Sequence, residues 1–209
     1  MDTFVVRLWL PDRPGALGQV ASRIGGVHAD VVGIEILERG GGSAIDDLTV
    51  GLPDAGLVDL LISEIRQVDG VGVEHVRPVA ADRPDGSMAV LATASAIVTA
   101  PTEQRLGSAC SALRDLLDAD WVIALCTGDA PSAIAQCGPT PELDWLAAFL
   151  LGSEHLGDEH ESDHTPGDLV WSRLARRRVA MAAGRAGRVF HRRERDEFRV
   201  LCGILDALA

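Results

Sequence analysis

The chain has 209 residues, of which 47% are hydrophobic and 24% are charged, and this suits one or two domains with ordinary apolar cores. Its formal net charge of −12 argues against broad binding to nucleic acids or to anionic membranes. No apolar run is long enough to span a membrane and no secretory leader is recognised, so we expect a cytoplasmic protein.

The first segment with a clear pattern combines a strand, a turn and a helix. Apolar residues alternate over residues 4–10, as in a half-buried strand, and recur at helical spacing over residues 17–24. Between them lies the turn Asp12-Arg13-Pro14-Gly15-Ala16-Leu17, in which Gly15 lets a backbone or a ligand approach closely. A second apolar strand begins near Asp30.

The same order of strand, helix and strand then repeats. Strands are predicted at about 30–39 and 43–52, a helix at about 54–68 and a closing strand at 71–78, with the glycines at 40–42 as a hairpin. Such a βαββαβ string predicts a ferredoxin-like fold, in which a four-stranded antiparallel sheet is covered on one face by two helices.

Residues 3–79 resemble an ACT domain, a regulatory module that binds amino acids. The resemblance depends on the turn at 12–17 and on the strand opening Ala29-Asp30-Val31-Val32-Gly33-Ile34. It implies a small effector, typically an amino acid, that binds between two such domains, and hence a homodimer or a higher homo-oligomer. The ligand contacts that it implies are Leu10, Asp12, Arg13, Gly15, Ala16, Asp30 and Val31.

Asp12 and Asp30 stand where the family more usually has asparagine. An ionised carboxylate only accepts hydrogen bonds, so these two side chains favour the ammonium group of an amino acid, or a cation. Backbone N–H groups at the start of the helix would then bind any carboxylate of the ligand. In the alternative interpretation, Asp12 and Asp30 only cap a helix and a turn.

A second domain follows a polar linker. We assign residues 1–80 to the ACT-like domain, 81–87 to the linker and 88–209 to a second, smaller-sheet α/β domain, which makes the fold class α+β. Helices are predicted at about 88–98, 101–117, 141–151 and 192–208, and strands at 121–126, 132–137, 169–175 and 178–184. This order resembles a reduced GAF-like domain, a fold in which the terminal helices commonly pair between subunits.

One segment of the second domain carries metal-ligand residue types. The acidic stretch at 153–168 contains His155, His160 and His164 among carboxylates. Gly157 and the run Thr165-Pro166-Gly167 argue against a stable helix there, so a mobile, solvated loop is favoured over a metal site. The four cysteines, Cys110, Cys126, Cys137 and Cys202, form no Cys-x-x-Cys pair and are expected to be free thiols.

No catalytic motif is found. The chain lacks a Gly-x-Ser-x-Gly elbow, a phosphate-binding loop and a His-Glu-x-x-His helix, so we expect neither an enzyme nor a bound cofactor. The leading hypothesis is a non-enzymatic regulatory protein that binds an amino acid at an ACT-domain dimer interface. The alternative is an interaction or dimerisation scaffold with a vestigial ligand site, and a metal-dependent enzyme using residues 155–164 ranks last.

Overall fold

The computed structural model describes residues 1–127, 130–153, 166–176 and 179–208. The chain divides into an N-terminal unit, Met1–Gly86, and a C-terminal unit, Ser87–Ala209. All strands of both units belong to two antiparallel four-stranded sheets, so the predicted α+β class is confirmed. In the described part of the chain, no helix is both long and apolar enough to cross a bilayer.

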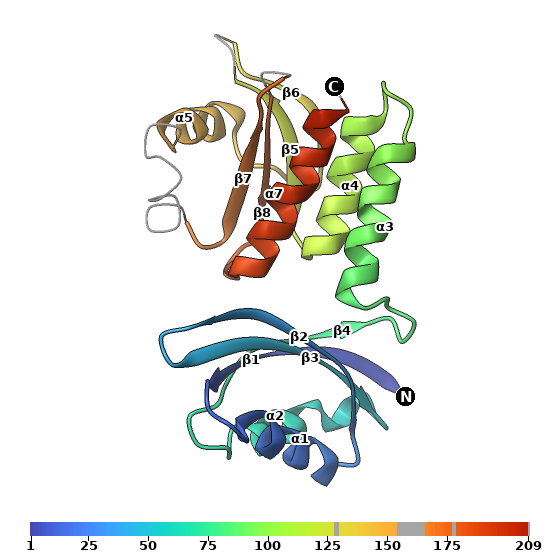
Figure 1. Cartoon of the computed structure of the whole chain (residues 1–209), viewed down its shortest axis with the longest axis vertical. Coiled ribbons are helices and arrows are strands. Elements are labelled where there is room, and N and C mark those ends of the chain that lie inside the picture. Colours follow the sequence, from blue (N-terminus) through green and yellow to red (C-terminus); the bar gives the residue numbers. More distant parts are fainter. Residues whose placement is uncertain (128–129, 154–165, 177–178, 209) are drawn as a thin grey trace. The chain divides into compact units, whose positions relative to one another are not determined.

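The N-terminal unit is one four-stranded sheet with two helices on one face (Figure 1). Its elements are β1 (Asp2–Pro11), α1 (Ala16–Gly26), β2 (Asp30–Gly40), β3 (Ser43–Leu52), the 3-10 turn η1 (Ala55–Leu57), α2 (Val58–Ile65) and β4 (Gly72–Val79). The strand order is β2-β3-β1-β4, so β2 and β4 are the edge strands. This is the predicted ferredoxin-like arrangement, and the prediction is confirmed.

The core of the N-terminal unit lies between this sheet and the two helices. Every second residue of β1, from Phe4 to Leu10, points toward the helices and is buried there, as the alternation predicts. From α1 the core takes Val20 and Ile24, whereas Ala21, which shares their helical stripe in the sequence, is exposed. Burial of these apolar side chains is the main force that fixes the sheet on the helices.

The hairpin between β2 and β3 uses the glycines at 40–42. All three have positive φ angles, of 159°, 61° and 82°, and residues with a side chain rarely adopt them. The chain therefore reverses direction there with little backbone strain. The end of β2 pairs with the start of β3, which also pairs with the end of β1.

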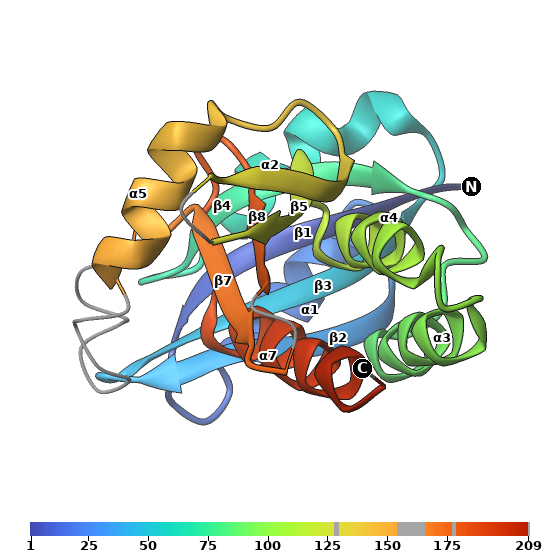
Figure 2. The same cartoon turned by 90° about the horizontal axis from the view of Figure 1, so that it is seen from above.

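The C-terminal unit has three layers (Figures 1 and 2). Its elements are α3 (Gly86–Thr99), α4 (Arg105–Leu117), β5 (Trp121–Cys126), β6 (Ser132–Cys137), α5 (Leu143–Ser153), β7 (Leu169–Leu174), β8 (Val179–Gly184) and α7 (Arg192–Ala207). The strand order is β6-β5-β8-β7. Helices α3, α4 and α7 pack on one face of the sheet and α5 packs on the other.

Strand β5 shows how the two faces divide. Val122 and Ala124 belong to the cluster with α4 and α7, while Trp121, Ile123 and Leu125 belong to the cluster with α5. Because successive side chains of a strand point to opposite faces, a strand buried on both sides has a continuous apolar sequence. The likeness of residues 88–209 to GAF-like domains stays a prediction.

Candidate functional site

The turn between β1 and α1 is built around Gly15. This residue precedes the first helical residue and has a φ of 88°, in the left-handed region that favours glycine. No side chain caps α1; the backbone N–H of Asp12 instead donates to the carbonyl of Gly42 over 2.9 Å. The interpretation that Asp12 caps the helix is therefore wrong, because Gly15 is the N-cap residue and no described side chain forms a capping hydrogen bond there.

The residues that the ACT resemblance implies as contacts fall into two groups. Leu10 and Ala16 are buried and contribute to the shape of the turn, while Val31 is half-buried on β2. Asp12, Arg13, Gly15 and Asp30 are exposed. Arg13 makes one long hydrogen bond, of 3.4 Å, to the side chain of Gln19. The exposed group therefore contains the polar side chains that a ligand could reach.

Asp12 and Asp30 lie at opposite ends of the sheet. Asp30 pairs with Gly51 at the start of β2, whereas Asp12 follows Pro11, which pairs with Ser43. The eight-residue offset between Ser43 and Gly51 along β3 corresponds to roughly 26 Å at the usual rise of a strand. One chain therefore does not bring these two carboxylates together.

Asp46 is a site residue that the sequence analysis missed. It lies on β3 opposite Leu8, on the face that carries the helices, and it is buried. Among the described residues, its Oδ1 has no hydrogen-bond partner. Burial raises the pKa of Asp46 and the neighbouring carboxylates of Asp47 and Asp12 add to this rise, while Arg39 opposes it.

The position of Asp46 links it to the turn. Its electrostatic neighbours Asp12 and Arg39 come from the β1–α1 turn and from the end of β2. A buried carboxyl oxygen without a partner is costly, and this makes Asp46 a candidate for binding a donor that the protein itself does not supply. The sequence signal for it is the acidic pair at 46–47 inside an otherwise apolar strand.

Strand β2 presents an unpaired edge with apolar side chains. Val32, Ile34 and Ile36 are 55%, 49% and 42% exposed along this strand. Exposed edge strands offer a row of free N–H and C=O groups, and natural proteins usually protect them or pair them with another strand. The edge of β2 is therefore suited to pairing with a second chain.

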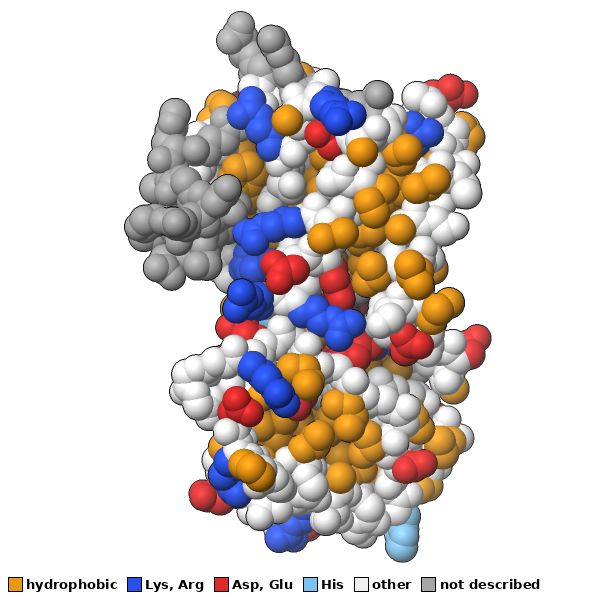
Figure 3. All heavy atoms as spheres, in the orientation of Figure 1, with side chains coloured by type: hydrophobic (Ala, Val, Ile, Leu, Met, Phe, Trp, Pro, Cys, Tyr) orange, Lys and Arg blue, Asp and Glu red, His pale blue; other side chains and the backbone are white. Residues whose placement is uncertain are grey.

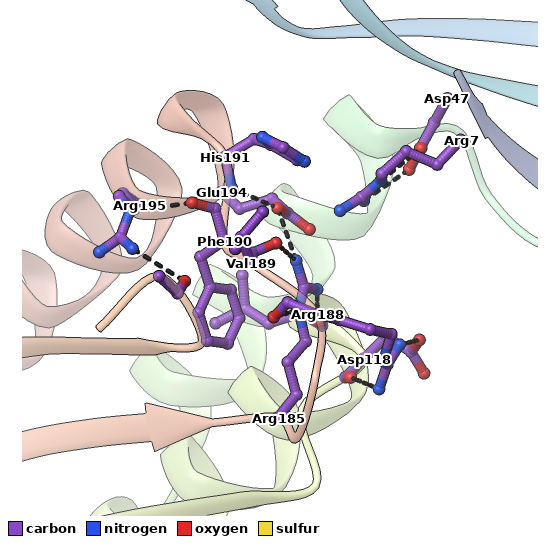
Figure 4. A network of polar contacts seen from close by, with 12 residues as sticks. Arg7, Asp47, Asp118, Arg185, Arg188, Val189, Phe190, His191, Glu194 and Arg195 are labelled. Carbon is purple, nitrogen blue, oxygen red and sulfur yellow. Dashed lines mark hydrogen bonds and ion pairs between the residues drawn. The ribbon is translucent and has the colours of Figure 1, made fainter. Parts of the chain in front are cut away.

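Arginines are frequent over residues 173–209, and one of them, Arg185, has a structural role (Figure 4). The guanidinium of Arg185 donates to the carbonyls of Leu117 and Val189 over 2.7 and 2.6 Å and to Glu194 over 2.8 Å, and it lies 4.1 Å from the centre of the Phe190 ring. Glu194 also accepts from the backbone N–H of His191 at the start of α7. These contacts satisfy Arg185 and fix the start of α7.

The candidate metal ligands His155, His160 and His164 lie outside the described residues. Within the part of the chain that is described, no three His, Cys, Asp or Glu side chains gather as a metal site would require. All four cysteines are free thiols, as predicted. Burial raises the pKa of the Cys110 thiol to about 12 and also raises that of Cys202.

Among known proteins, this chain is similar to solved structures, and that similarity is weak. No protein-family model matches the chain, and no curated protein matches it. An unknown protein from Galdieria sulphuraria is 19% identical, with a TM-score of 0.34, over 45% of this chain and 63% of that one. The ACT domain of GTP pyrophosphokinase from Chlorobium tepidum is 19% identical, with a TM-score of 0.30, over 38% of this chain and all of that domain.

A third structure is the C-terminal domain of the MgtC protein from Mycobacterium tuberculosis. It is 14% identical, with a TM-score of 0.31, over 40% of this chain and 90% of that domain. Likenesses of this size carry no conclusion about a ligand or a partner. Function has to be argued from the residues of the chain itself.

Proposed function

We propose that the N-terminal unit is a non-enzymatic regulatory module that binds a small ligand, an amino acid, in a site shared by two copies of the chain. The observation that carries the proposal is the separation of Asp12 and Asp30 at opposite ends of one sheet. Two exposed carboxylates that the ACT resemblance implies as ligand contacts can act on one ligand only if they come from different copies.

A twofold pairing of two β2 edges would bring these carboxylates together. In an antiparallel pair, the start of one strand lies beside the end of the other, and a twofold axis repeats that contact. The end of β2 at Gly40 adjoins Gly42, whose carbonyl binds the backbone N–H of Asp12. Asp30 of one copy would therefore approach the Asp12 turn of the other copy.

The apolar side chains on β2 support this assembly. Pairing of the two edges would remove Val32, Ile34 and Ile36 from water and would satisfy the free backbone groups of both strands. In a symmetric dimer both chains contribute the same three side chains, so the buried area is twice that of one chain.

The charges of the shared site favour an ammonium group. Asp12 and Asp30 offer exposed carboxylate oxygens, which accept hydrogen bonds and attract a cation, and the buried carboxyl group of Asp46 is an electrostatic neighbour of Asp12. The exposed backbone around Gly15, where nothing lies within 4 Å of the missing Cβ, leaves room for a ligand carboxylate at the start of α1. An amino acid carries both groups.

Regulation would follow from linkage. A ligand that contacts two copies at once stabilises the dimer geometry for which it has the higher affinity, and the C-terminal unit would respond to that geometry or would dimerise itself. Helix α3 exposes Met88, Leu91 and Val98, and hydrophobic side chains gather over α3 and α4 on the face drawn in Figure 3. Such a helix surface suits a second contact between copies.

A thermal-shift screen of the purified protein against the twenty amino acids and common divalent metals tests the proposal. A ligand at one hundred times its dissociation constant stabilises the folded state by about 2.7 kcal/mol, and this is readily measured. We expect one amino acid, or a few of similar shape, to raise the melting temperature through the shared site, and this part of the shift to disappear in Asp12→Ala and in Asp30→Ala. A stable dimer that responds to no amino acid would instead favour the scaffold.

A further inference from the structure

We propose that the C-terminal unit carries a second small-molecule site, which binds a zwitterionic amino acid with a large apolar or aromatic side chain. The site is a pocket of about 760 Å³ at the end of the sheet where β5 and β7 begin and β8 ends. Pockets of this volume are typical of small-molecule sites. Residues from α4 and α5 complete its walls.

Much of the pocket wall is apolar. The indole of Trp121 lies over Gly184, because a Cβ built on that glycine would come within 2.4 Å of the Trp121 ring. Trp145 on α5 stacks on Phe149, with ring centres 5.7 Å apart, and is still 52% exposed. Prolines 139, 141 and 166 line the remaining surface and contribute no N–H donors.

Two charged groups that line the pocket form no ion pair with any residue that the structure describes. Arg114 donates its Nε to the carbonyl of Asp120 over 3.2 Å, which orients the side chain, and its two Nη groups have no partner among the described residues. Asp168 accepts from the N–H of Arg185 only through its backbone carbonyl, at 3.1 Å, and its carboxylate has no described partner.

The other charged residues of the lining are already paired. The carboxylate of Asp120 accepts from the N–H of Ala186 over 2.8 Å and lies 3.6 Å from Arg188. Arg185 is fully engaged in the network around Glu194. The pocket therefore offers a ligand one cation, Arg114, and one anion, Asp168.

The placement of Arg114 and Asp168 on opposite sides of the pocket suits a zwitterion. Asp120 and Asp168 precede β5 and β7, which lie on either side of β8, so their backbones are about 10 Å apart, or two strand spacings. Arg114 reaches in from the Asp120 side. Arg114 and Asp168 thus enter the pocket from opposite sides, and charge-assisted hydrogen bonds to the carboxylate and the ammonium of the ligand would hold it between them. The apolar side chain of the ligand would then lie against the two indoles.

Calorimetric titration of the full chain with L-phenylalanine tests this proposal. We expect saturable binding that weakens by about tenfold or more in Arg114→Gln, in Asp168→Asn and in Trp145→Ala. The first two remove a charged contact with the ligand, and the third removes an apolar contact with its side chain. Asp115→Asn is the matched control, because Asp115 is an exposed neighbour of Arg114 outside the pocket. Unchanged melting temperatures of Asp168→Asn and Trp145→Ala would show that these variants fold.

Three further compounds test the class of ligand. L-alanine lacks the aromatic side chain, 3-phenylpropionate lacks the ammonium and phenethylamine lacks the carboxylate, so each should bind more weakly than L-phenylalanine by about tenfold or more. Equal binding of 3-phenylpropionate would overturn the zwitterionic assignment. Absence of L-phenylalanine binding, or binding unaffected by the three pocket variants, would overturn the site.

The site is distinguishable from the one proposed for the N-terminal unit. Asp12→Ala and Asp30→Ala should leave L-phenylalanine binding to the pocket intact. If these variants abolish binding and Arg114→Gln and Asp168→Asn do not, the ligand occupies the N-terminal unit, which would overturn the pocket and leave the proposed function standing.

Discussion

Arg7 on β1 holds Asp47 on β3 in a bidentate ion pair, with Nε 2.7 Å from one carboxylate oxygen and Nη2 2.9 Å from the other (Figure 4). The two residues are directly opposite each other in the sheet. Asp46, one residue earlier, points to the other face and has a buried oxygen without a described partner. Of two adjacent aspartates, one is therefore paired with an arginine, while the other has a buried oxygen that no described group satisfies.

Asp46→Asn should stabilise the protein at neutral pH. Since burial raises the pKa of Asp46, the folded state binds its proton more tightly than the unfolded state does, and wild-type stability falls as the pH rises through the interval between the two pKa values. Below the ordinary aspartate pKa of about 4, the carboxyl is protonated in both states and the advantage of asparagine should largely disappear. Urea unfolding at a series of pH values measures this difference.

Asp47→Asn is the control for that experiment. It removes the ionised partner of Arg7, so it should lower stability at neutral pH instead of raising it, by about 1 kcal/mol or more. Equal effects of the two substitutions at neutral pH would contradict the separate roles assigned to Asp46 and Asp47.

Gly15→Ala should destabilise the protein by about 1 kcal/mol or more, because alanine is strained at a φ of 88°. Gly18→Ala is a matched control in the same helix. Nothing lies within 4 Å of its missing Cβ and its φ is not in the left-handed region, so alanine there should stabilise by about 0.5 to 1 kcal/mol. Chemical denaturation measures the free energy of unfolding of both variants. Destabilisation of similar size at both positions would argue against a left-handed conformation at Gly15.

Ile34→Lys should weaken or abolish the proposed dimer, because it places a charge in the middle of the β2 edge that we expect to be buried between copies. Leu60→Lys on α2 changes a side chain of similar exposure, 48%, in the same unit and away from that edge. Analytical ultracentrifugation of the two variants compares them. A dimer that tolerates Ile34→Lys as well as Leu60→Lys would be assembled through another surface.

The cysteines should differ in reactivity. Cys110 and Cys202 are buried and have raised pKa values, about 12 for Cys110, so their thiolates should be scarce and shielded at pH 8. Cys126 and Cys137 are half-buried at the strand ends and should react first. Iodoacetamide labelling of the native protein, read by peptide mass spectrometry, should modify Cys126 and Cys137 before the other two. Early modification of Cys202 would contradict its burial on the inner face of α7.

Local patterns predicted most of the fold. The strands at 121–126 and 132–137 match the observed β5 and β6 because short apolar runs between turn residues leave little freedom of placement. The helix expected over 54–68 is instead a 3-10 turn followed by α2, which ends at Ile65. The next residues form tighter i to i−3 bonds, such as that from Val68 to Ile65, ahead of Gly70 with its positive φ.

The candidate sites were less predictable. The turn at 12–17 could be found from the sequence because its residues are consecutive. Asp46 could not, because its raised pKa comes mainly from burial, with a further rise from Asp12, and only the folded sheet buries Asp46 and brings Asp12 near it. The pocket of the C-terminal unit likewise combines Arg114, Trp145 and Asp168, and no local pattern connects residues so far apart in the chain.

The measurement that tests the shared site most directly is ligand binding to a mixed dimer. Asp12→Ala chains and Asp30→Ala chains, coexpressed with different affinity tags and purified through both, would form a dimer with one doubly altered site and one intact site. With an amino acid whose stabilising effect is lost in both Asp12→Ala and Asp30→Ala, calorimetry should find about half of the wild-type stoichiometry in the mixed dimer and no binding in either parent variant. A mixed dimer that binds no better than its parents would contradict the account, because Asp12 and Asp30 would then not complete one site from two copies.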